Sequence, residues 1–308
     1  MASSALLEPS VSLDPTPGGL PASFQFFRPR PPLDHFVELL FCSQVSQHFT
    51  GNVDAMRLPE VEAQLVFAIE EGNLFPEGQP LADGRRACLF LQPAHLQFFP
   101  IPGSIREAVG VALKPAGLRL ILSQGAGNLI DDPLIPLEQL WGAEARMLLE
   151  AMMAEATPRA RLTLLEGHLQ ARLRPLPLPS PIVRHAFQLA QAAHGEISTE
   201  RLAEACGCTS RTLRSLTVAE AGMSPKHLAR IFRIRRALEL LSEAGVPLTD
   251  TALSSAFSDH AHMSREFREL LGEPPSRVRV RIRSTALPSF SAERNLISTG
   301  LLVMPKKQ

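Results

Sequence analysis

Several side chains in the last third of the sequence have the chemistry to read nucleic-acid bases. Arg211 and Arg214 lie three positions apart in a segment expected to form a helix over Ser210–Glu220. This spacing places both side chains on one outer face, beside Ser215. The planar fork of a guanidinium matches the O6 and N7 acceptors of guanine in the DNA major groove. These residues therefore indicate a helix that reads bases.

A second group with related chemistry lies about fifty positions further along the chain. Its members are expected on the outer face of another helix: His260, Ala261, His262 and Arg265. Arg265 again offers a bidentate donor, whereas a histidine is mostly neutral at pH 7 and forms weaker contacts. The two groups predict two reading helices of unequal strength, the first carrying more sequence information.

Four basic residues lie in the long helical segment between these groups. Ser224 and Pro225 suit the N-cap and first position of that helix. The basic residues follow at spacings of 4, 3 and 3: Lys226, Arg230, Arg233 and Arg236. Their regular spacing indicates either contacts to DNA phosphates or a solvated face, rather than base reading.

The surrounding pattern predicts a helix-turn-helix unit around each reading helix. In the first unit Ser198 caps a helix, Ala203 lets a second helix cross closely, and Gly207 supplies a left-handed turn. Cys206, Cys208, Leu213 and Leu216 are expected to pack between its two helices. In the second unit Ala252 and Ala256 replace Ala203 and Gly207, and Ser258 is expected as the N-cap, with Met263, Phe267 and Leu270 in the core.

These segments strongly resemble the AraC/XylS family of transcription regulators. The match lies in LAEACGCTSRTL, in GMSPKHLARIFRIRRALELL and in AFSDHAHMSREFRELLGEPPSRVR. The resemblance implies a sequence-specific, DNA-binding regulator. Five positions depart from the family pattern. Ala256 stands in place of the usual Gly, Thr217 in place of Phe, and Ser215 where a basic residue is common, and Thr251 and Ser255 are polar where apolar groups are usual. Upstream, RPRPPLDHFVELLF, RLPEVEAQLVFAI and VGVALKPAGLRLIL are similar to a sensor domain of one subgroup of this family.

The rest of the chain predicts an α+β protein with a separate N-terminal domain. Strand-like runs at Leu65–Ile69, Ala87–Leu91 and Ala108–Leu113 favour a β-rich barrel or sandwich-like domain. Two apolar stripes then predict helices: Leu148, Leu149, Met152 and Met153, followed by Leu162, Leu165, Leu169 and Leu173. The expected division is a disordered arm over 1–23, a sensor or association domain over 24–173, a proline-rich linker over 174–181, an all-α DNA-binding domain over 182–283 and a flexible tail over 284–308.

Composition and charge agree with this division. Residues 182–283 contain 15 Lys and Arg against 11 Asp and Glu, so this basic domain balances an acidic remainder within a chain of net charge zero. No apolar run is long enough to span a bilayer, and the first residues do not have the pattern of a signal peptide. Four cysteines in 308 residues fit a reducing compartment, so we expect a cytoplasmic protein.

Other chemistry is weaker in the sequence. Cys206 and Cys208 fall at packing positions, and the nine histidines have no metal-ligand spacing, so no metal or cofactor is expected. The sequence contains no nucleophile motif, phosphate loop or acid–base pair, which disfavours an enzyme. An interaction scaffold with a degenerate helix-turn-helix remains the alternative. The expected partner is double-stranded DNA, and RNA polymerase, a small-molecule effector and a second copy of the chain are further candidates.

Overall fold

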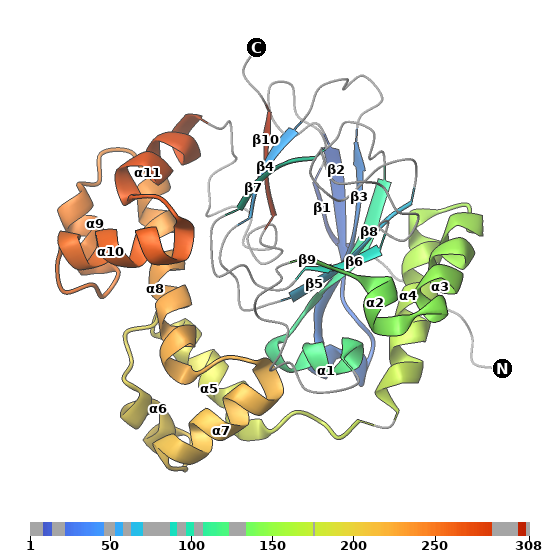
Figure 1. Cartoon of the computed structure of the whole chain (residues 1–308), viewed down its shortest axis with the longest axis horizontal. Helices are drawn as coiled ribbons and strands as arrows, with labels where there is room; N and C mark the ends of the chain where they lie inside the picture. The colour runs from blue at the N-terminus through green and yellow to red at the C-terminus, as the bar shows by residue number, and fades with distance from the viewer. Residues whose placement is uncertain are drawn as a thin grey trace.

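The structure is a computed structural model, which describes the helices and strands of the chain and all but one residue between 134 and 284. The described residues are 9–13, 22–45, 53–57, 63–69, 87–90, 97–101, 107–122, 134–174, 176–284 and 301–305. Figure 1 shows a β-rich N-terminal part and a helical C-terminal part that lie beside each other. The protein is thus α+β, as predicted.

A seven-stranded antiparallel sheet forms the centre of the N-terminal domain. Its strand order is β1-β2-β3-β8-β5-β6-β9. The strands span Pro9–Leu13 (β1), Ala22–Phe27 (β2), Val37–Val45 (β3), Glu107–Leu113 (β8), Ala63–Ala68 (β5), Ala87–Phe90 (β6) and Leu134–Pro136 (β9). Every residue of β5 and β8 is buried, because both strands are nearly continuous apolar runs in the middle of the sheet. The three predicted strand runs correspond to β5, β6 and β8, and Leu91 lies outside the described residues.

A second, three-stranded sheet has the order β10-β4-β7. It joins Leu301–Pro305 (β10), Val53–Arg57 (β4) and Gln97–Ile101 (β7) by antiparallel pairing. Parts of both chain ends are therefore strands. Pro9–Leu13 was expected in a disordered arm, yet it pairs with β2, and Leu301–Pro305 was expected in a flexible tail, yet it pairs with β4. Extended pairing of such short segments depends on a partner strand far away in the sequence, which local composition does not reveal.

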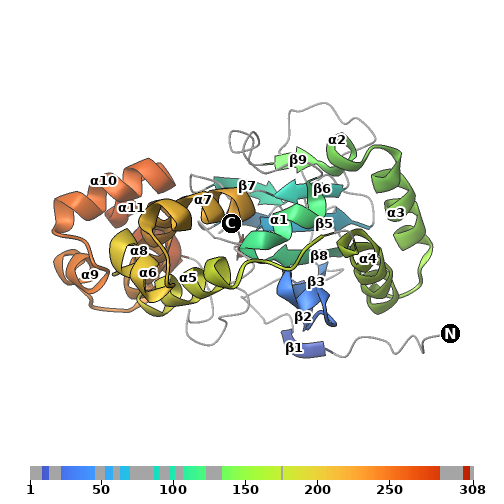
Figure 2. The ribbon, with the colours of Figure 1, turned by 90° about the horizontal axis from the view of Figure 1, so that it is seen from below.

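Short and long helices cover the large sheet. They are Leu33–His35 (η1), Pro115–Gly117 (η2), Leu118–Ile121 (α1), Leu137–Trp141 (α2), Ala143–Ala154 (α3) and Pro158–Leu173 (α4). Helix α4 packs on β3 and β8, and α3 packs on α4 (Figure 2). The predicted stripe of four leucines on α4 is fully buried, as expected. On α3, by contrast, Met153 of the predicted stripe is 43% exposed, because the buried face of α3 follows Ala145, Leu148, Leu149 and Met152.

The C-terminal domain consists of seven helices. They span Pro181–Ala192 (α5), Thr199–Ala205 (α6), Ser210–Ala221 (α7), Pro225–Ser242 (α8), Leu248–Ser254 (α9), His260–Leu271 (α10) and Pro275–Ser284 (α11). Helix α8 supplies residues to two separate apolar cores. Leu228, Ile231 and Phe232 pack among α5, α6 and α7, whereas Ile234, Leu238 and Leu241 pack among α9, α10 and α11. The domain is therefore two small units joined by one shared helix (Figure 1). Among the helices that the structure describes, none has the length and apolarity to cross a membrane.

Candidate nucleic-acid interface

The first helix-turn-helix unit has the geometry that the sequence predicts. The Ser198 hydroxyl accepts a hydrogen bond from the amide of Arg201 at 3.3 Å, and Thr209 caps α7 in the same way. Gly207 in the turn has a φ of 67°, the left-handed region that favours glycine. Leu202, Ala203 and Leu213 are buried between α6 and α7, and Cys206, Cys208 and Leu216 pack at the edge of this core.

The predicted reading residues of α7 point to solvent. Arg211, Arg214 and Ser215 are all exposed. Neither guanidinium makes an ion pair with any residue that the structure describes, so both remain available to a ligand. Thr217, where the family usually has Phe, is buried, and its hydroxyl donates to the carbonyl of Arg214 at 3.2 Å. This bond satisfies a buried polar group that an aromatic side chain would not have introduced.

The second unit repeats the arrangement of the first but differs at its turn and at the N-cap of its reading helix. Ala256 occupies the turn with a φ of 57°, so a residue with a Cβ adopts the conformation that Gly207 adopts in the first unit. The N-cap of α10 is Asp259 rather than the predicted Ser258: the Asp259 carboxylate accepts the amide of His262 at 2.6 Å. This hydrogen bond lowers the pKa of the Asp259 carboxyl. A carboxylate at a helix N-terminus also gains from the helix dipole, which a hydroxyl does not.

The predicted residues of α10 divide into two groups. His260, Ala261 and Arg265 are exposed on the outer face, like Arg211 and Arg214 on α7. His262 is half-buried instead, with its Nδ1 3.1 Å from the Ser258 hydroxyl and its ring edge against Phe257 at 5.5 Å between ring centroids. The ring of His262 is therefore held by its neighbours, whereas His260 and Arg265 are free to reach a partner.

The four basic residues of α8 do not form one solvated row. Lys226 is exposed, and Arg236 pairs with Glu239 at 3.0 Å. Arg233 is half-buried over the ring of Phe257 at 5.8 Å, and burial lowers the pKa of its guanidinium. Arg230 forms ion pairs with Glu266 and Glu269 of α10, both at 2.7 Å. The sequence offered one signal for this contact, two glutamates spaced by three on α10, which sequence reasoning did not use.

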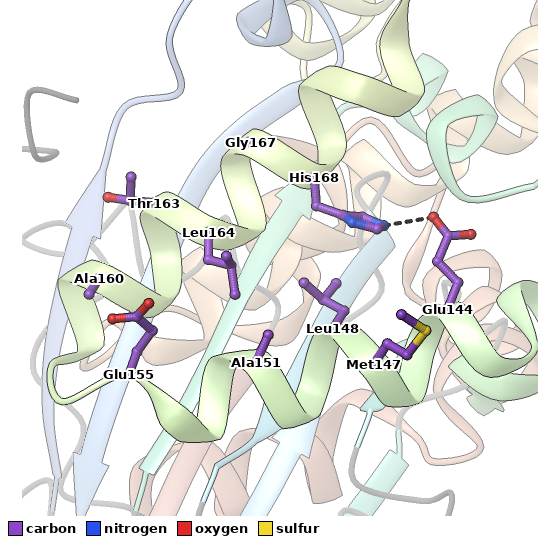
Figure 3. A pocket seen from close by; sticks show the side chains of 10 residues that line it. All are labelled: Glu144, Met147, Leu148, Ala151, Glu155, Ala160, Thr163, Leu164, Gly167 and His168. Atoms are coloured by element: carbon purple, nitrogen blue, oxygen red, sulfur yellow. Dashed lines mark ion pairs between the residues drawn. The ribbon is translucent and has the colours of Figure 1, made fainter. Parts of the chain in front are cut away.

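The N-terminal domain contains a groove between α3 and α4 (Figure 3). Its volume is about 800 Å³, and its walls are mainly apolar or small side chains. Its lining comprises Glu144, Met147, Leu148, Ala151, Glu155, Ala160, Thr163, Leu164, Gly167 and His168. Small-molecule sites in proteins have volumes of roughly 300–1,000 Å³ and a mostly apolar lining, so the groove has the size and surface of such a site.

One end of the groove is polar. The Glu144 carboxylate lies 3.0 Å from Nε2 of His168 and 2.8 Å from Nη1 of Arg172. The guanidinium of Arg172 in turn stacks over the ring of Trp141 at 4.3 Å. Burial lowers the pKa of the His168 imidazole, and the Glu144 charge offsets this only in part.

Among the described residues, no group of three or more His, Cys, Asp or Glu side chains is placed to hold a metal ion. Cys42, Cys206 and Cys208 are free thiols. Burial raises the pKa of the Cys42 thiol to about 12 and also raises that of Cys206, so neither has the lowered pKa of a reactive cysteine.

Comparison with known proteins gives one family match and several similar structures. A helix-turn-helix domain family matches residues 202–281. A probable AraC family transcriptional regulator from Rhodopseudomonas palustris CGA009 is 33% identical over 34% of this chain and 99% of its own, with a TM-score of 0.31. The C-terminal domain of AraT, a response regulator from Geobacillus stearothermophilus, is 27% identical over 34% of this chain and 88% of its own, with a TM-score of 0.32.

A longer alignment exists to ToxT from Vibrio cholerae O395. It covers 76% of this chain and 94% of that one, at 12% identity and a TM-score of 0.39. Comparison with curated proteins gives no match.

Proposed function

Because this chain belongs to the AraC family of DNA-binding transcription regulators, we propose that it reads promoter sequences through α7 and α10 and responds to a small-molecule effector in its N-terminal domain. One observation carries the DNA-reading part of the proposal. Each helix-turn-helix unit presents exposed side chains suited to base edges, Arg211 and Arg214 on α7 and Arg265 on α10, and none of these guanidiniums is ion-paired within the described residues.

The spacing of the two reading helices fits duplex DNA. Helix α8 has 18 residues and is therefore about 27 Å long. The helical repeat of B-DNA is roughly 34 Å, so helices at the two ends of α8 can enter successive major grooves, with bending of the DNA to bring both into place. We propose that α7 contributes more sequence information than α10, because it presents two free arginines against one.

Arg214→Ala tests base reading directly. The operator is first selected from a random DNA library with the full chain, and binding is then measured on every single-base variant of it. Loss of a bidentate guanine contact should cost about 1–3 kcal/mol and remove the preference at one base pair. The matched control is Arg201→Ala, which removes an exposed arginine from α6 rather than α7. Arg214 is not a base contact if its variant weakens all operators equally and keeps the same preferences.

Phosphate contacts predict a different response to salt. Lys226 is the exposed member of the basic set on α8, and we propose that it binds a DNA phosphate. Removing one such contact should reduce the slope of log K against log salt by about 0.9 and weaken all sequences alike. An interaction scaffold, the alternative class of protein, would give no salt-dependent retardation of DNA in a mobility-shift assay.

We propose that the effector occupies the groove between α3 and α4. Its volume of about 800 Å³ and its apolar walls support this choice. A small-molecule library screened by thermal shift on the full chain would provide ligands, and Ala151→Trp, which fills the groove, should abolish the shifts. Glu150→Trp on the exposed side of α3 is the control. Ligands that stabilise the Ala151→Trp protein as well as the wild type would place the effector site elsewhere.

The remaining partners follow from the same role. We propose that the protein acts in the cytoplasm on double-stranded DNA, with RNA polymerase and a second copy of the chain as candidate macromolecular partners. No catalytic step is part of this function.

A further inference from the structure

Arg230 joins the long helix α8 to the second reading helix. Its Nε donates to Oε2 of Glu266 at 2.7 Å, and its Nη2 lies 2.7 Å from Oε1 of Glu269. The Arg230 and Glu266 side chains are only 17% and 15% exposed. Charge-assisted hydrogen bonds of this kind are stronger and more directional than neutral ones, especially away from bulk water. One guanidinium therefore holds two carboxylates that lie one helical turn apart on α10.

The charge around Arg230 is already compensated. Burial alone would lower the pKa of its guanidinium, but the hydrogen bonds and charges of Glu266 and Glu269 outweigh this effect and raise that pKa. Arg233, the second cation of this cluster, is half-buried, and burial together with the Arg230 charge lowers the pKa of His227, which favours its neutral form. Arg230 thus faces two carboxylates, and Arg233 lies close enough to Glu266 to be affected by its charge. A DNA phosphate approaching Arg230 would meet little net positive charge.

Glu266 also lies near the first turn of α10. The other oxygen of Glu266 lies 3.9 Å from Nε2 of His262. His262 is in the first turn of α10 and contacts Ser258 and Phe257 in the turn that precedes this helix. A series of contacts therefore runs from Arg230 through Glu266 and His262 to the N-terminal end of α10. The exposed His260 lies at this end of the helix. A shift of α10 on α8 would move these residues together.

We propose that Arg230 is a positioning residue for base recognition by the second unit. It fixes the position of α10 on α8 and does not contact DNA. This inference rests on the proposed DNA reading by α10, and it replaces the expectation that Arg230 contacts a phosphate. Lys226, one turn earlier on the same helix, differs from Arg230 because its side chain is exposed.

The test compares Arg230→Gln with Lys226→Gln in the full chain, on the selected operator and its single-base variants. Arg230→Gln should flatten base preference about tenfold, only in the half of the operator read by α10, and should leave the salt slope unchanged. Lys226→Gln should weaken all variants alike and reduce the slope by about 0.9. A reduced slope with intact base preferences for Arg230→Gln would overturn the proposal.

Charge reversal separates positioning from phosphate binding. The double variant Arg230→Glu/Glu266→Arg restores an ion pair between α8 and α10 and places a negative charge where the arginine was. It should recover base preference relative to Arg230→Glu alone. A phosphate contact could not be recovered in this way, so failure of the double variant to exceed the single one counts against positioning.

Two further measurements cover folding and the premise. Arg230→Lys keeps the charge and the fold but loses the fork that holds two carboxylates, so it should keep its melting temperature within a few degrees and still lose preference in the α10 half. Hydrogen exchange of α10 amides should speed up in Arg230→Gln and not in Lys226→Gln. If the wild type selects no operator, the DNA-reading proposal fails. The hydrogen-exchange data still test whether Arg230 positions α10 on α8. Unchanged exchange in Arg230→Gln would refute this positioning role.

Discussion

Glu166 is a fully buried carboxylate in the middle of α4. It accepts the backbone amide of Arg30 at 2.7 Å and Nε of Arg30 at 2.6 Å, and a second guanidinium nitrogen of Arg30 completes the ion pair. A charge inside a protein is stable only when such partners replace its hydration. The pair ties α4 to the segment between β2 and η1, which lies 136 positions away in the sequence.

Arg30→Met should therefore destabilise the N-terminal domain strongly. It leaves the Glu166 charge buried with the backbone amide alone, and breaking such a pair costs roughly 3 kcal/mol. The double variant Arg30→Met/Glu166→Met removes the charge as well and should recover part of the loss. Urea denaturation of the three proteins measures this difference. A double variant that is less stable than Arg30→Met would show that the carboxylate has other essential partners.

His168 makes the free energy of unfolding depend on pH. Because burial lowers the pKa of the folded imidazole, the unfolded state binds a proton more readily. The stabilising contribution is complete above the unfolded pKa of about 6.5 and is lost as pH falls below it towards the lower folded pKa. His168→Gln should thus flatten the fall in the free energy of unfolding between pH 7 and pH 5. Parallel stability curves for the two proteins would contradict this role.

Side-chain exposure could be predicted from helical spacing, but side-chain partners could not. The outward positions of Arg211, Arg214 and Arg265 follow from a period of 3.6 residues and the apolar positions between them. The pairing of Arg230 with Glu266 depends on how α8 crosses α10, which no local pattern encodes. Of the four basic residues predicted on one face of α8, only Lys226 is exposed, and the three arginines contact other side chains.

At the scale of elements, the two turns of the helix-turn-helix units offer a matched comparison. Gly207 and Ala256 both have positive φ, at 67° and 57°. A Cβ added to Gly207 would meet nothing within 4 Å. The difference between the two turns is therefore conformational, since an L-residue in the left-handed region costs about 1 kcal/mol relative to glycine.

Opposite substitutions should have opposite effects on stability. Gly207→Ala should destabilise the first unit and Ala256→Gly should stabilise the second. The free energy of unfolding should change by about 1 kcal/mol in each case, and the melting temperature should shift in the same direction. Hydrogen exchange of α7 and α10 amides assigns each effect to its unit. Equal destabilisation by both changes would mean that the turn of the second unit depends on the methyl group of Ala256 for packing.

Helix boundaries were the most predictable feature of the fold. Ser198 and Ser224 are N-caps where the sequence places them, and Pro225 is the first residue of α8, because caps and prolines act locally. At α10 two adjacent capping residues, Ser258 and Asp259, compete, and local rules do not decide between them. The paired segments β1 and β10 were missed because strands of this kind form only against partners distant in sequence.

At the scale of the whole molecule, the N-terminal domain touches the first reading helix. Figures 1 and 2 show α1 beside α7, and both η2 and α1 contact α7. Arg211 and Arg214 stay exposed in this arrangement. The contact therefore links the two domains without covering the residues proposed to read DNA.

The N-cap of α5 lies within the segment that the sequence assigns to the linker. The expected boundary was residue 182, but α5 begins at Pro181 with Ser180 as its N-cap. The Ser180 hydroxyl accepts the amide of Ile182 at 3.3 Å, and the Ser180 amide donates to the Glu220 carboxylate at 3.0 Å. Ser180, in the expected linker, thus connects the start of α5 to the C-terminal end of α7 by a hydrogen bond.

A fragment of residues 178–284 should consequently be more stable than one of residues 182–284. The shorter fragment loses the N-cap of α5, which is worth about 1 kcal/mol, and it loses the partner of Glu220. Both fragments retain the apolar cores around α8, so both should be helical by circular dichroism and bind the selected operator. Thermal denaturation of the two fragments, and of Ser180→Ala in the longer one, measures the cap separately from the rest. If the two fragments melt at the same temperature, the Ser180 contacts contribute nothing to the domain, and its boundary belongs at residue 182 after all.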